Sequence, residues 1–379
     1  MQIIALTAAL LTLAGLAQQV FGALLAEQFC KHLRASPSQL PGVSVLKPLY
    51  GTEALTELAL ESFFLLDYPV YQLVFGVQSK NDPVLAVLSN LRARYPKQDI
   101  AVMVNDAEHG RNRKVSNLIN MKPLAKHEVI VISDADVHVP PYYLNAILAA
   151  FEEPDVGLVT TIYTGLPANP SLAAQLGAAQ LNYNFLPGAL LARRLGRQDC
   201  MGVTMAIRAD VLEKIGGLEA LANYLADDQV LGRLVLAAGK KITLAPVIPA
   251  TTVPEQDFAS LFQHELRWAR TIRALVPVAY LGTIFQMPLL LAALAMAFSA
   301  LAIWSVLLFV GALGVRALTA WRIEAALGLP KRQNIWLFLL RDFFSTLIYI
   351  ASFTGNRVDW HGQPMVADSG RVDFGRKSE

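Results

Sequence analysis

Two long stretches without a charged side chain constrain the fold of this chain more than any other feature. They cover residues 1–26 and 274–315. A helix needs about 20 apolar residues to cross a bilayer, so the first stretch is long enough for one span and the second for two. The sequence therefore predicts an N-terminal transmembrane anchor over 1–26 and a transmembrane hairpin over 274–315. A signal peptide is the alternative for 1–26, although its usual basic start is missing.

The composition agrees with a membrane protein. Of the 379 residues, 54% are hydrophobic and only 16% are charged, and the mean hydropathy is +0.41. These values are typical of integral membrane proteins rather than soluble ones. The formal net charge of +2 is too small to indicate a nucleic-acid partner. Two widely spaced cysteines, Cys30 and Cys200, predict buried free thiols rather than a disulfide framework.

Basic residues near the apolar stretches predict the topology. Lys31 and Arg34 follow the first stretch, and arginines border the second stretch on both sides. Because cytoplasmic flanks are enriched in Lys and Arg, we expect the N-terminus outside and the middle of the chain in the cytoplasm. The hairpin would then return the chain to the cytoplasmic side.

A third apolar stretch, 335–353, contains Arg341 and Asp342. It is either a third span that holds a buried ion pair or a helix that lies at the membrane interface. The two charges favour the interfacial or re-entrant form. A tail over 354–379 follows it.

The middle of the chain, residues 43–255, has the pattern of an α/β domain. Short runs rich in β-branched residues alternate with stretches of helical periodicity, which predicts a mostly parallel sheet. The expected strands are Val43–Leu46, Tyr71–Val77, Ile100–Val104 and Glu128–Ile132, and the expected helices begin at Thr52, Asp82 and Lys114. In such sheets ligands bind beyond the carboxyl ends of the strands. Polar residues collect at these ends, including Lys47 after the first strand.

The fourth expected strand ends in a pair of carboxylates, Asp134 and Asp136. Oxygen ligands of this kind suit Mg²⁺ or Mn²⁺, which usually complete their shells with phosphate and water. The pair therefore predicts a site for a metal-bound nucleotide diphosphate. A solvated turn at the end of a strand is the alternative.

Three further polar groups are candidates, and each has an ordinary structural alternative. Asp82 opens an expected helix, where it would serve as an N-cap. Lys114 ends a basic loop that suits phosphate, although basic loops are also common near membranes. Asp227 and Asp228 are adjacent, so their repulsion raises the pKa of at least one carboxyl if they are partly buried. Asp228 is then a candidate general base, the alternative being a helix start that complements the dipole.

An amphipathic segment over 256–273 precedes the hairpin and contains His264, Arg267 and Trp268. Arg267 could neutralise a leaving diphosphate, and Trp268 could stack on a sugar or line an acceptor path. A basic and aromatic anchor at the membrane surface is the alternative interpretation.

Taken in order, these motifs resemble the inverting glycosyltransferases of the family-2 type with a GT-A fold. The stretches Val77-Gln78-x-x-x-Asp82-Pro83, Asn112-x-Lys114-x-x-Asn117-Leu118, Ala226-Asp227-Asp228 and Arg267-Trp268 are similar to the ceramide glucosyltransferase family. Residues His109–Leu118 and His264–Thr271 look most like its bacterial hopanoid-biosynthesis branch. The resemblance covers nearly the whole chain. It implies a location in the bacterial inner membrane, with the catalytic domain facing the cytoplasm.

The resemblance implies a role for each matching residue. Asp82 would hold the nucleotide, Asp134 the nucleotide and the metal, and Asp136 the metal. Asp228 would be the general base. Lys47 and Lys114 are expected to contact the nucleotide sugar as well.

Arg267 and Trp268 would serve the diphosphate and the acceptor, and Asp227 is a further candidate on the acceptor side. Two departures from the family pattern stand out. His264 occupies the position of the glutamine in Gln-x-x-Arg-Trp, and Ser79 stands where the family commonly has an acid.

The implied reaction is a single displacement that moves a sugar from UDP to a lipid hydroxyl and inverts the anomeric centre. N-acetylglucosamine transfer to a polyol hopanoid is the first expectation, and glucose transfer to ceramide or another lipid is the alternative. A processive polysaccharide synthase and an inactive membrane scaffold are less favoured. The few predicted spans offer little for a polymer channel, and the motif residues are all present.

Overall fold

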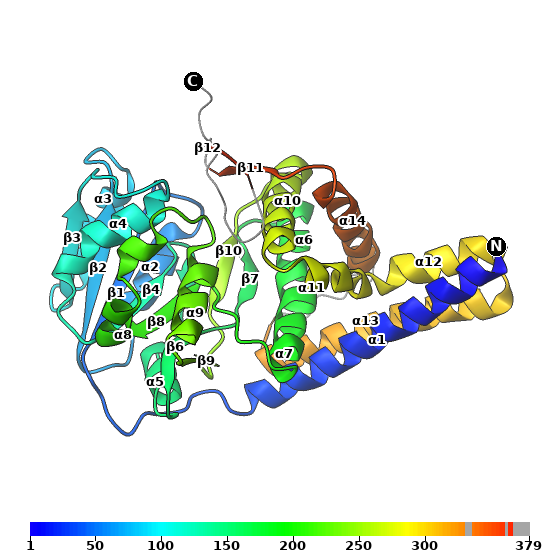
Figure 1. Ribbon diagram of the computed structural model, residues 1–379, viewed down its shortest axis with the longest axis horizontal. Coiled ribbons are helices and arrows are strands. Elements are labelled where there is room, and N and C mark those ends of the chain that lie inside the picture. Colours follow the sequence, from blue (N-terminus) through cyan, green and yellow to red (C-terminus); the bar gives the residue numbers. More distant parts are fainter. Residues whose placement is uncertain (330–335, 361–362, 367–379) are drawn as a thin grey trace. The chain divides into compact units, whose positions relative to one another are not determined.

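The computed structural model describes residues 1–329, 336–360 and 363–366, which form two compact units (Figure 1). The α/β unit consists of His32–Ala168 and Arg197–Pro254. The helical unit consists of Met1–Lys31, Asn169–Gly196 and the chain from Glu255 onward. The C-terminal part of the expected tail, from residue 367, lies outside the described residues, as does residue 335 of the third apolar stretch.

A seven-stranded sheet forms the centre of the α/β unit. Its order is β3-β2-β1-β4-β8-β6-β9. The bounds are β1 Val43–Pro48, β2 Tyr71–Val77, β3 Asp99–Val104, β4 Val129–Ser133, β6 Val156–Thr160, β8 Thr204–Arg208 and β9 Lys241–Leu244. β1 to β4 are parallel, β8 is antiparallel to both of its neighbours, and β6 and β9 are parallel. The predicted mostly parallel α/β sheet is therefore confirmed.

Alternating side chains of each central strand enter two different cores. Val129 and Val131 pack on one face of the sheet, whereas Ile130 and Ile132 pack on the other. The first core is covered by α2 Thr56–Phe64, α3 Val84–Arg94 and α5 Tyr143–Ala150. The second is covered by α4 Arg113–Met121, α8 Ala209–Lys214 and α9 Asp227–Ala237, with the 3-10 turns η1 Lys122–Leu124 and η3 Leu218–Leu221 alongside. Burial on both faces explains why these strands are continuously apolar.

A small second sheet has the order β5-β10-β7, with β5 Val137–His138, β7 Thr164–Pro167 and β10 Ala250–Val253. It joins the chain just after β4 to the last strand of the α/β unit.

Helix α2 begins at Thr56 rather than at the expected Thr52. Leu55 adopts a left-handed conformation (φ 66°), which prevents the helix from starting earlier. Thr56 Oγ1 instead accepts a hydrogen bond from Glu53 N at 2.8 Å, so the residues before the helix form a turn.

The helical unit contains ten helical segments among the described residues. They are α1 Gln2–Cys30, α6 Leu172–Gln180, the π-helical turn η2 Leu181–Phe185, α7 Leu186–Arg194, α10 Phe258–Leu275, α11 Pro277–Leu281, η4 Gly282–Gln286, α12 Pro288–Phe298, α13 Ile303–Leu327 and α14 Trp336–Ser352. A strand pair, β11 Arg357–Trp360 and β12 Gln363–Val366, follows them.

Helix α1 lies alongside α7, α12 and α13 (Figure 1). Two of its glycines permit the close approach. A Cβ at Gly15 would lie 2.6 Å from Phe285 O, and one at Gly22 would lie 2.6 Å from Pro187 Cβ. Any larger residue at either position would push the neighbouring segment away.

Within the described residues, α1 and α13 are long and apolar enough to cross a membrane. The pair Pro277–Gln286 and Pro288–Phe298 would make a third span if its 69° bend is counted as a break within one span. The apolar stretch expected to form a hairpin over 274–315 thus consists of a bent pair of short segments and one long helix. That helix continues twelve residues past 315 to Leu327. It can do so because Arg316 is buried among polar partners rather than exposed as a flanking charge.

The structure also places residues 169–196 in the helical unit, whereas the sequence pattern put them in a single domain over 43–255. Their apolar side chains pack against the apolar helices; Tyr183 and Phe338, for example, have ring centroids 5.6 Å apart. The segment therefore has helical periodicity but no part in the sheet.

Arg341 and Asp342 of α14 are both 1% exposed, and they do not pair with each other. Arg341 pairs with Glu265 of α10, whereas Asp342 Oδ1 lies 2.9 Å from Arg316 Nη2 of α13. Asp342 Oδ2 also accepts a hydrogen bond from Leu289 N, at the start of α12. Two adjacent residues of α14 thus contact different helices: Arg341 contacts α10, and Asp342 contacts α13 and α12.

Candidate active site

A lysine at the start of α4 lies between carboxylates that come from distant parts of the chain. Lys114 Nζ is 2.8 Å from Asp134 Oδ1 and 3.3 Å from Asp227 Oδ2. Asn112 caps this helix by accepting a hydrogen bond from Val115 N, which fixes where Lys114 begins its first turn. Burial lowers the pKa of Lys114, but Asp134, Asp227 and Asp228 outweigh it and raise the pKa above its usual range. The lysine therefore stays charged.

Asp134 and Asp136 follow β4 directly, and their side chains have different partners. Asp134 is ion-paired with Lys114, whereas Asp136 Oδ2 accepts a hydrogen bond from Thr251 Oγ1 of β10. Burial, and then the charge of Asp134, raise the pKa of Asp136 to about 6.

No group of three His, Cys, Asp or Glu side chains that could hold a metal ion by itself occurs in the described part of the chain. Asp134 and Asp136 nevertheless supply the hard oxygen donors that Mg²⁺ and Mn²⁺ prefer. The residues fit a cation that takes only one or two ligands from the protein and the others from a diphosphate and water.

Asp227 and Asp228 begin helix α9. Asp227 is 6% exposed, and burial followed by the charge of Asp134 raises its pKa, although Lys114 opposes the shift. Asp228 is partly exposed, and its Oδ1 accepts a hydrogen bond from Gln229 N at 2.7 Å. Burial and the neighbouring Asp227 raise the pKa of Asp228 to about 7, again against Lys114. A carboxylate that titrates near neutrality and is reachable by solvent is suited to accepting a proton.

Gly202 borders Asp228. A Cβ at this position would lie 3.3 Å from Asp228 Oδ2, so the glycine leaves the side of the carboxylate open.

Lys47, at the end of β1, was expected to contact the nucleotide sugar, yet its side chain is fully buried. Its Nζ donates a hydrogen bond to Asp134 O at 2.6 Å and lies 3.7 Å from the centre of the Phe63 ring. Burial lowers its pKa to about 7, although Asp136 and Asp134 oppose the shift. Lys47 thus supports the turn that carries Asp134 instead of presenting a free ammonium group.

Asp82 organises the chain around it. Its Oδ1 accepts a hydrogen bond from Val84 N at the start of α3, and its Oδ2 accepts one from Gly51 N, both at 2.9 Å. The capping role considered as the structural alternative is therefore present. A contact with the nucleotide remains a prediction.

In the helical unit, α10 presents His264, Arg267 and Trp268 on adjoining turns. The rings of His264 and Trp268 have centroids 4.3 Å apart, and His264 Nδ1 is hydrogen-bonded to Glu255. Burial lowers the pKa of Arg267. The histidine that replaces glutamine in the family pattern therefore packs on the tryptophan of the same motif.

Sequence reasoning did not single out Thr251, Glu255 or Gly202. Thr251 holds Asp136 from 115 positions away, and the threonines of β10 have no spacing that would mark them. Glu255 lies nine residues before His264, which is the only local signal for that contact.

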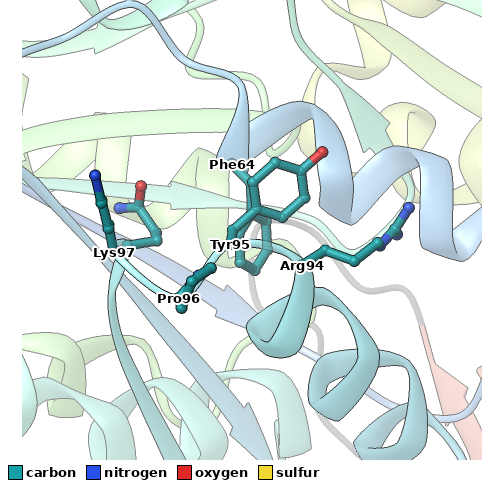
Figure 2. Close-up of a pocket in the computed structure, with 6 residues that line it drawn as sticks. Phe64, Arg94, Tyr95, Pro96 and Lys97 are labelled. Carbon is teal, nitrogen blue, oxygen red and sulfur yellow. The ribbon is translucent and has the colours of Figure 1, made fainter.

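Figure 2 shows a pocket of about 340 Å³ that lies elsewhere in the α/β unit and is lined by Phe64, Arg94, Tyr95, Pro96, Lys97 and Gln98. These residues end α2 and α3 and lead into β3, so the pocket lies at the amino ends of parallel strands. The carboxylates and Lys114 belong to the opposite, carboxyl edge, where ligands of such sheets bind. None of the candidate site residues lines the pocket.

A family model described as Glycosyl transferase family 21 matches residues 4–373. Ceramide glucosyltransferase 1 of Caenorhabditis elegans is 25% identical over 254 residues, covering 65% of this chain and 53% of that protein. Ceramide glucosyltransferase of Komagataella phaffii is 35% identical over 107 residues, covering 27% of this chain and 21% of that protein. The chain thus spans about half the length, or less, of these relatives.

Among solved structures, a mannosyltransferase from Pyrobaculum calidifontis in complex with GDP-Man and Mn²⁺ is similar in fold. It superimposes with a TM-score of 0.52 and 20% identity, covering 92% of this chain and 99% of that one. At this identity the likeness concerns the fold alone, which is of the GT-A type with a mostly parallel sheet.

Proposed function

The chain belongs to glycosyl transferase family 21, and from this membership we propose that it moves a hexose from a UDP-sugar to a lipid hydroxyl. The observation that carries the proposal is Lys114, which gathers Asp134 and Asp227 next to Asp228 at the carboxyl edge of the sheet. This cluster combines a cation for a diphosphate with a carboxylate for a proton. Two or three apolar helices in the same chain suit a lipid acceptor.

In the proposed reaction Asp228 takes the proton from the lipid hydroxyl while that oxygen attacks the anomeric carbon. The bond between the anomeric carbon and the phosphate oxygen breaks, and UDP leaves with the electron pair. A single displacement inverts the anomeric centre, so an α-linked UDP-sugar gives a β-glycoside. Lys114 stabilises the charge that develops on the diphosphate, a preorganised interaction of the kind that often dominates catalysis.

The remaining candidates take supporting roles in the proposal. Asp134 and Asp136 would hold Mg²⁺ or Mn²⁺, which when bound would neutralise the diphosphate. Lys47 holds the Asp134 turn. Arg267 and Trp268 are assigned to the diphosphate and the acceptor, as the family pattern implies.

Ceramide is the first candidate acceptor, because ceramide glucosyltransferases are among the curated relatives that the chain is similar to. A polyol hopanoid, expected from the sequence motifs, is the second. We further propose that the α/β unit faces the cytoplasm of a bacterial inner membrane, where UDP-sugars are available.

A product assay tests the proposal. Purified full-length protein in detergent is incubated with UDP-glucose or UDP-N-acetylglucosamine and with ceramide or a bacteriohopanepolyol, and products are identified by mass spectrometry. A hexosylated lipid is the expected result. Hydrolysis of the donor without any lipid product would contradict the assignment, and a sugar polymer would indicate a processive synthase.

Metal removal should stop the reaction. Because the protein offers two carboxylates but no complete ligand set within its described residues, EDTA is expected to reduce transfer to background. Added Mg²⁺ or Mn²⁺ should restore it in proportion to site occupancy, measured by initial rates over a metal titration. Transfer that continues at full rate in EDTA would remove the role given to Asp136.

The rate should depend on pH through Asp228. A base must be ionised, and the pKa of Asp228 is raised to about 7. Below this pH the protonated fraction grows, so kcat/KM should fall about tenfold per pH unit and should level off above it. A pH–rate profile measures this, with UDP-sugar binding followed over the same range as the control. A flat profile between about pH 5 and 7 would argue against Asp228 as the base.

A further inference from the structure

A buried arginine on α14 ties this helix to the one that carries the Arg-Trp motif. Arg341 is 1% exposed, and its Nη1 and Nη2 each lie 2.7 Å from a different oxygen of Glu265 on α10. Its Nη1 also donates to Leu176 O of α6 at 3.1 Å, and its Nε donates to Ser345 Oγ at 3.0 Å. Every nitrogen of the guanidinium is therefore engaged by groups within the helical unit.

Glu265 lies between the residues proposed to serve the reaction. It belongs to the buried stripe of α10 with Leu261 and Ala269, four residues to either side. His264, Arg267 and Trp268 are less buried; the helical repeat places His264 and Trp268 roughly a quarter-turn from Glu265 and Arg267 nearly on the opposite side of the helix. Any rotation of α10 about its axis would move Glu265 and these three side chains together.

The geometry of the Arg341–Glu265 ion pair matters as much as its position in the helical unit. An arginine and a carboxylate joined by two parallel hydrogen bonds have one favoured geometry, whereas apolar side chains of similar size pack at many angles. A buried ion pair is weak evidence for added stability, because desolvation offsets the attraction. We infer that the pair instead fixes the orientation of α10 about its own axis.

We propose that Glu265 and Arg341 are positioning residues, which fix α10 so that Arg267 and Trp268 are presented in one orientation. This inference rests on the proposed function, because it assigns those two residues to transfer. Neither Glu265 nor Arg341 is expected to touch a substrate.

Three variants separate positioning from plain stability. Arg341→Met and Glu265→Leu each leave one buried charge without its partner, so both should lower the melting temperature of the full-length protein in detergent. The double variant removes both charges and should recover most of that loss. Its kcat should nevertheless remain at least about tenfold below that of the unaltered protein, with the KM for the UDP-sugar within about twofold.

Arg322→Met is the matched control. Arg322 Nε lies 2.5 Å from Glu27 Oε1 in the same helical unit, but this ion pair is largely exposed and involves no residue of α10. The control should leave both the melting temperature and kcat close to those of the unaltered protein.

A second readout needs no activity. The five tryptophans of the chain include Trp268, whose ring packs on His264. Its emission is obtained without substrates, as the difference between each variant and the same variant carrying Trp268→Phe. A shifted Trp268 emission in the double variant is expected. Unaltered Trp268 emission in the double variant would overturn the inference, and this outcome can be read even if no lipid product is ever found.

Discussion

Replacing Asp228 with asparagine is expected to abolish sugar transfer while leaving UDP-sugar binding nearly intact. Asparagine has the same shape and can still accept the hydrogen bond from Gln229 N, so the start of α9 should persist. It cannot accept the proton of a hydroxyl. Loss of a general base typically costs about 10²–10⁴-fold in kcat. Folding should not suffer, because the substitution removes a charge next to the buried Asp227.

The measurement is kcat from lipid product formation, with donor affinity from equilibrium binding of UDP. Asp210→Asn is the matched control, since this aspartate on α8 is 65% exposed and pairs with the exposed Lys214. Its kcat should equal that of the unaltered protein. An Asp228→Asn variant that transfers sugar at the normal rate would exclude Asp228 as the base.

Replacing Lys114 with methionine is expected to weaken both the fold and catalysis. The ammonium group lies within 3.3 Å of two carboxylates, and methionine would leave them facing each other without a cation. Removing one partner of a buried charge pair costs about 2–5 kcal/mol, and the partial exposure of Lys114 (17%) and Asp134 (34%) places the expected loss at the lower end of that range. The free energy of unfolding should fall by a similar amount above neutral pH, and the loss should shrink at lower pH as the carboxylates become protonated.

Lys114→Met should also raise the pKa of Asp228 further, because Lys114 is the main group that opposes the rise. The acid limb of the pH–rate profile would then move to higher pH in any residual activity. Thermal unfolding in detergent at two pH values measures the loss of stability. Lys126→Met is the control, because its ion pair with Asp99 is exposed and is worth less than about 1 kcal/mol. Equal melting temperatures for Lys114→Met and Lys126→Met would contradict the interpretation that Lys114 stabilises the fold through Asp134 and Asp227.

Four of the seven strands of the large sheet were predictable from local sequence, whereas β6, β8 and β9 were not among the expected strands. β2 has the expected bounds, and β1, β3 and β4 differ from the expected ones by one or two residues at their ends. The nearly continuous apolar runs of β2 and β4 follow from burial on both faces, whereas the edge strand β3 is partly exposed. The start of α2 was not predictable, because the left-handed Leu55 leaves no signal in residue type.

The candidate site was predictable as a list of residues but not as a set of partners. The sequence places Asp134 and Asp227 at strand and helix ends, which suggests an edge of the sheet but does not show that Lys114 bridges them. The hydrogen-bond partner of Lys47 could not be predicted from the sequence either. Its position after a strand is compatible with a ligand contact, and only the tertiary structure shows its ammonium group bonded to Asp134 O.

The helical unit differed most from expectation. An uncharged stretch reads as a membrane hairpin by length alone, and nothing in residues 274–315 reveals that α13 runs on to Leu327. A charged residue such as Arg316 normally marks the end of a membrane span. Arg316 can instead lie within α13 because residues far away in the sequence pair with it.

The partners of Arg316 bear on the order in which the helices enter the membrane. Arg316 Nη1 bonds Asn184 Oδ1 at 3.1 Å, and Arg316 Nη2 bonds Asp342 Oδ1 at 2.9 Å. The ribosome delivers Asp342 well after α13, so this helix first reaches the bilayer with an arginine that lacks its acidic partner. An isolated charge of this kind is costly in lipid. We therefore expect α13 to become stably inserted only when α14 joins it, which insertion assays on chains truncated before Asp342 would test.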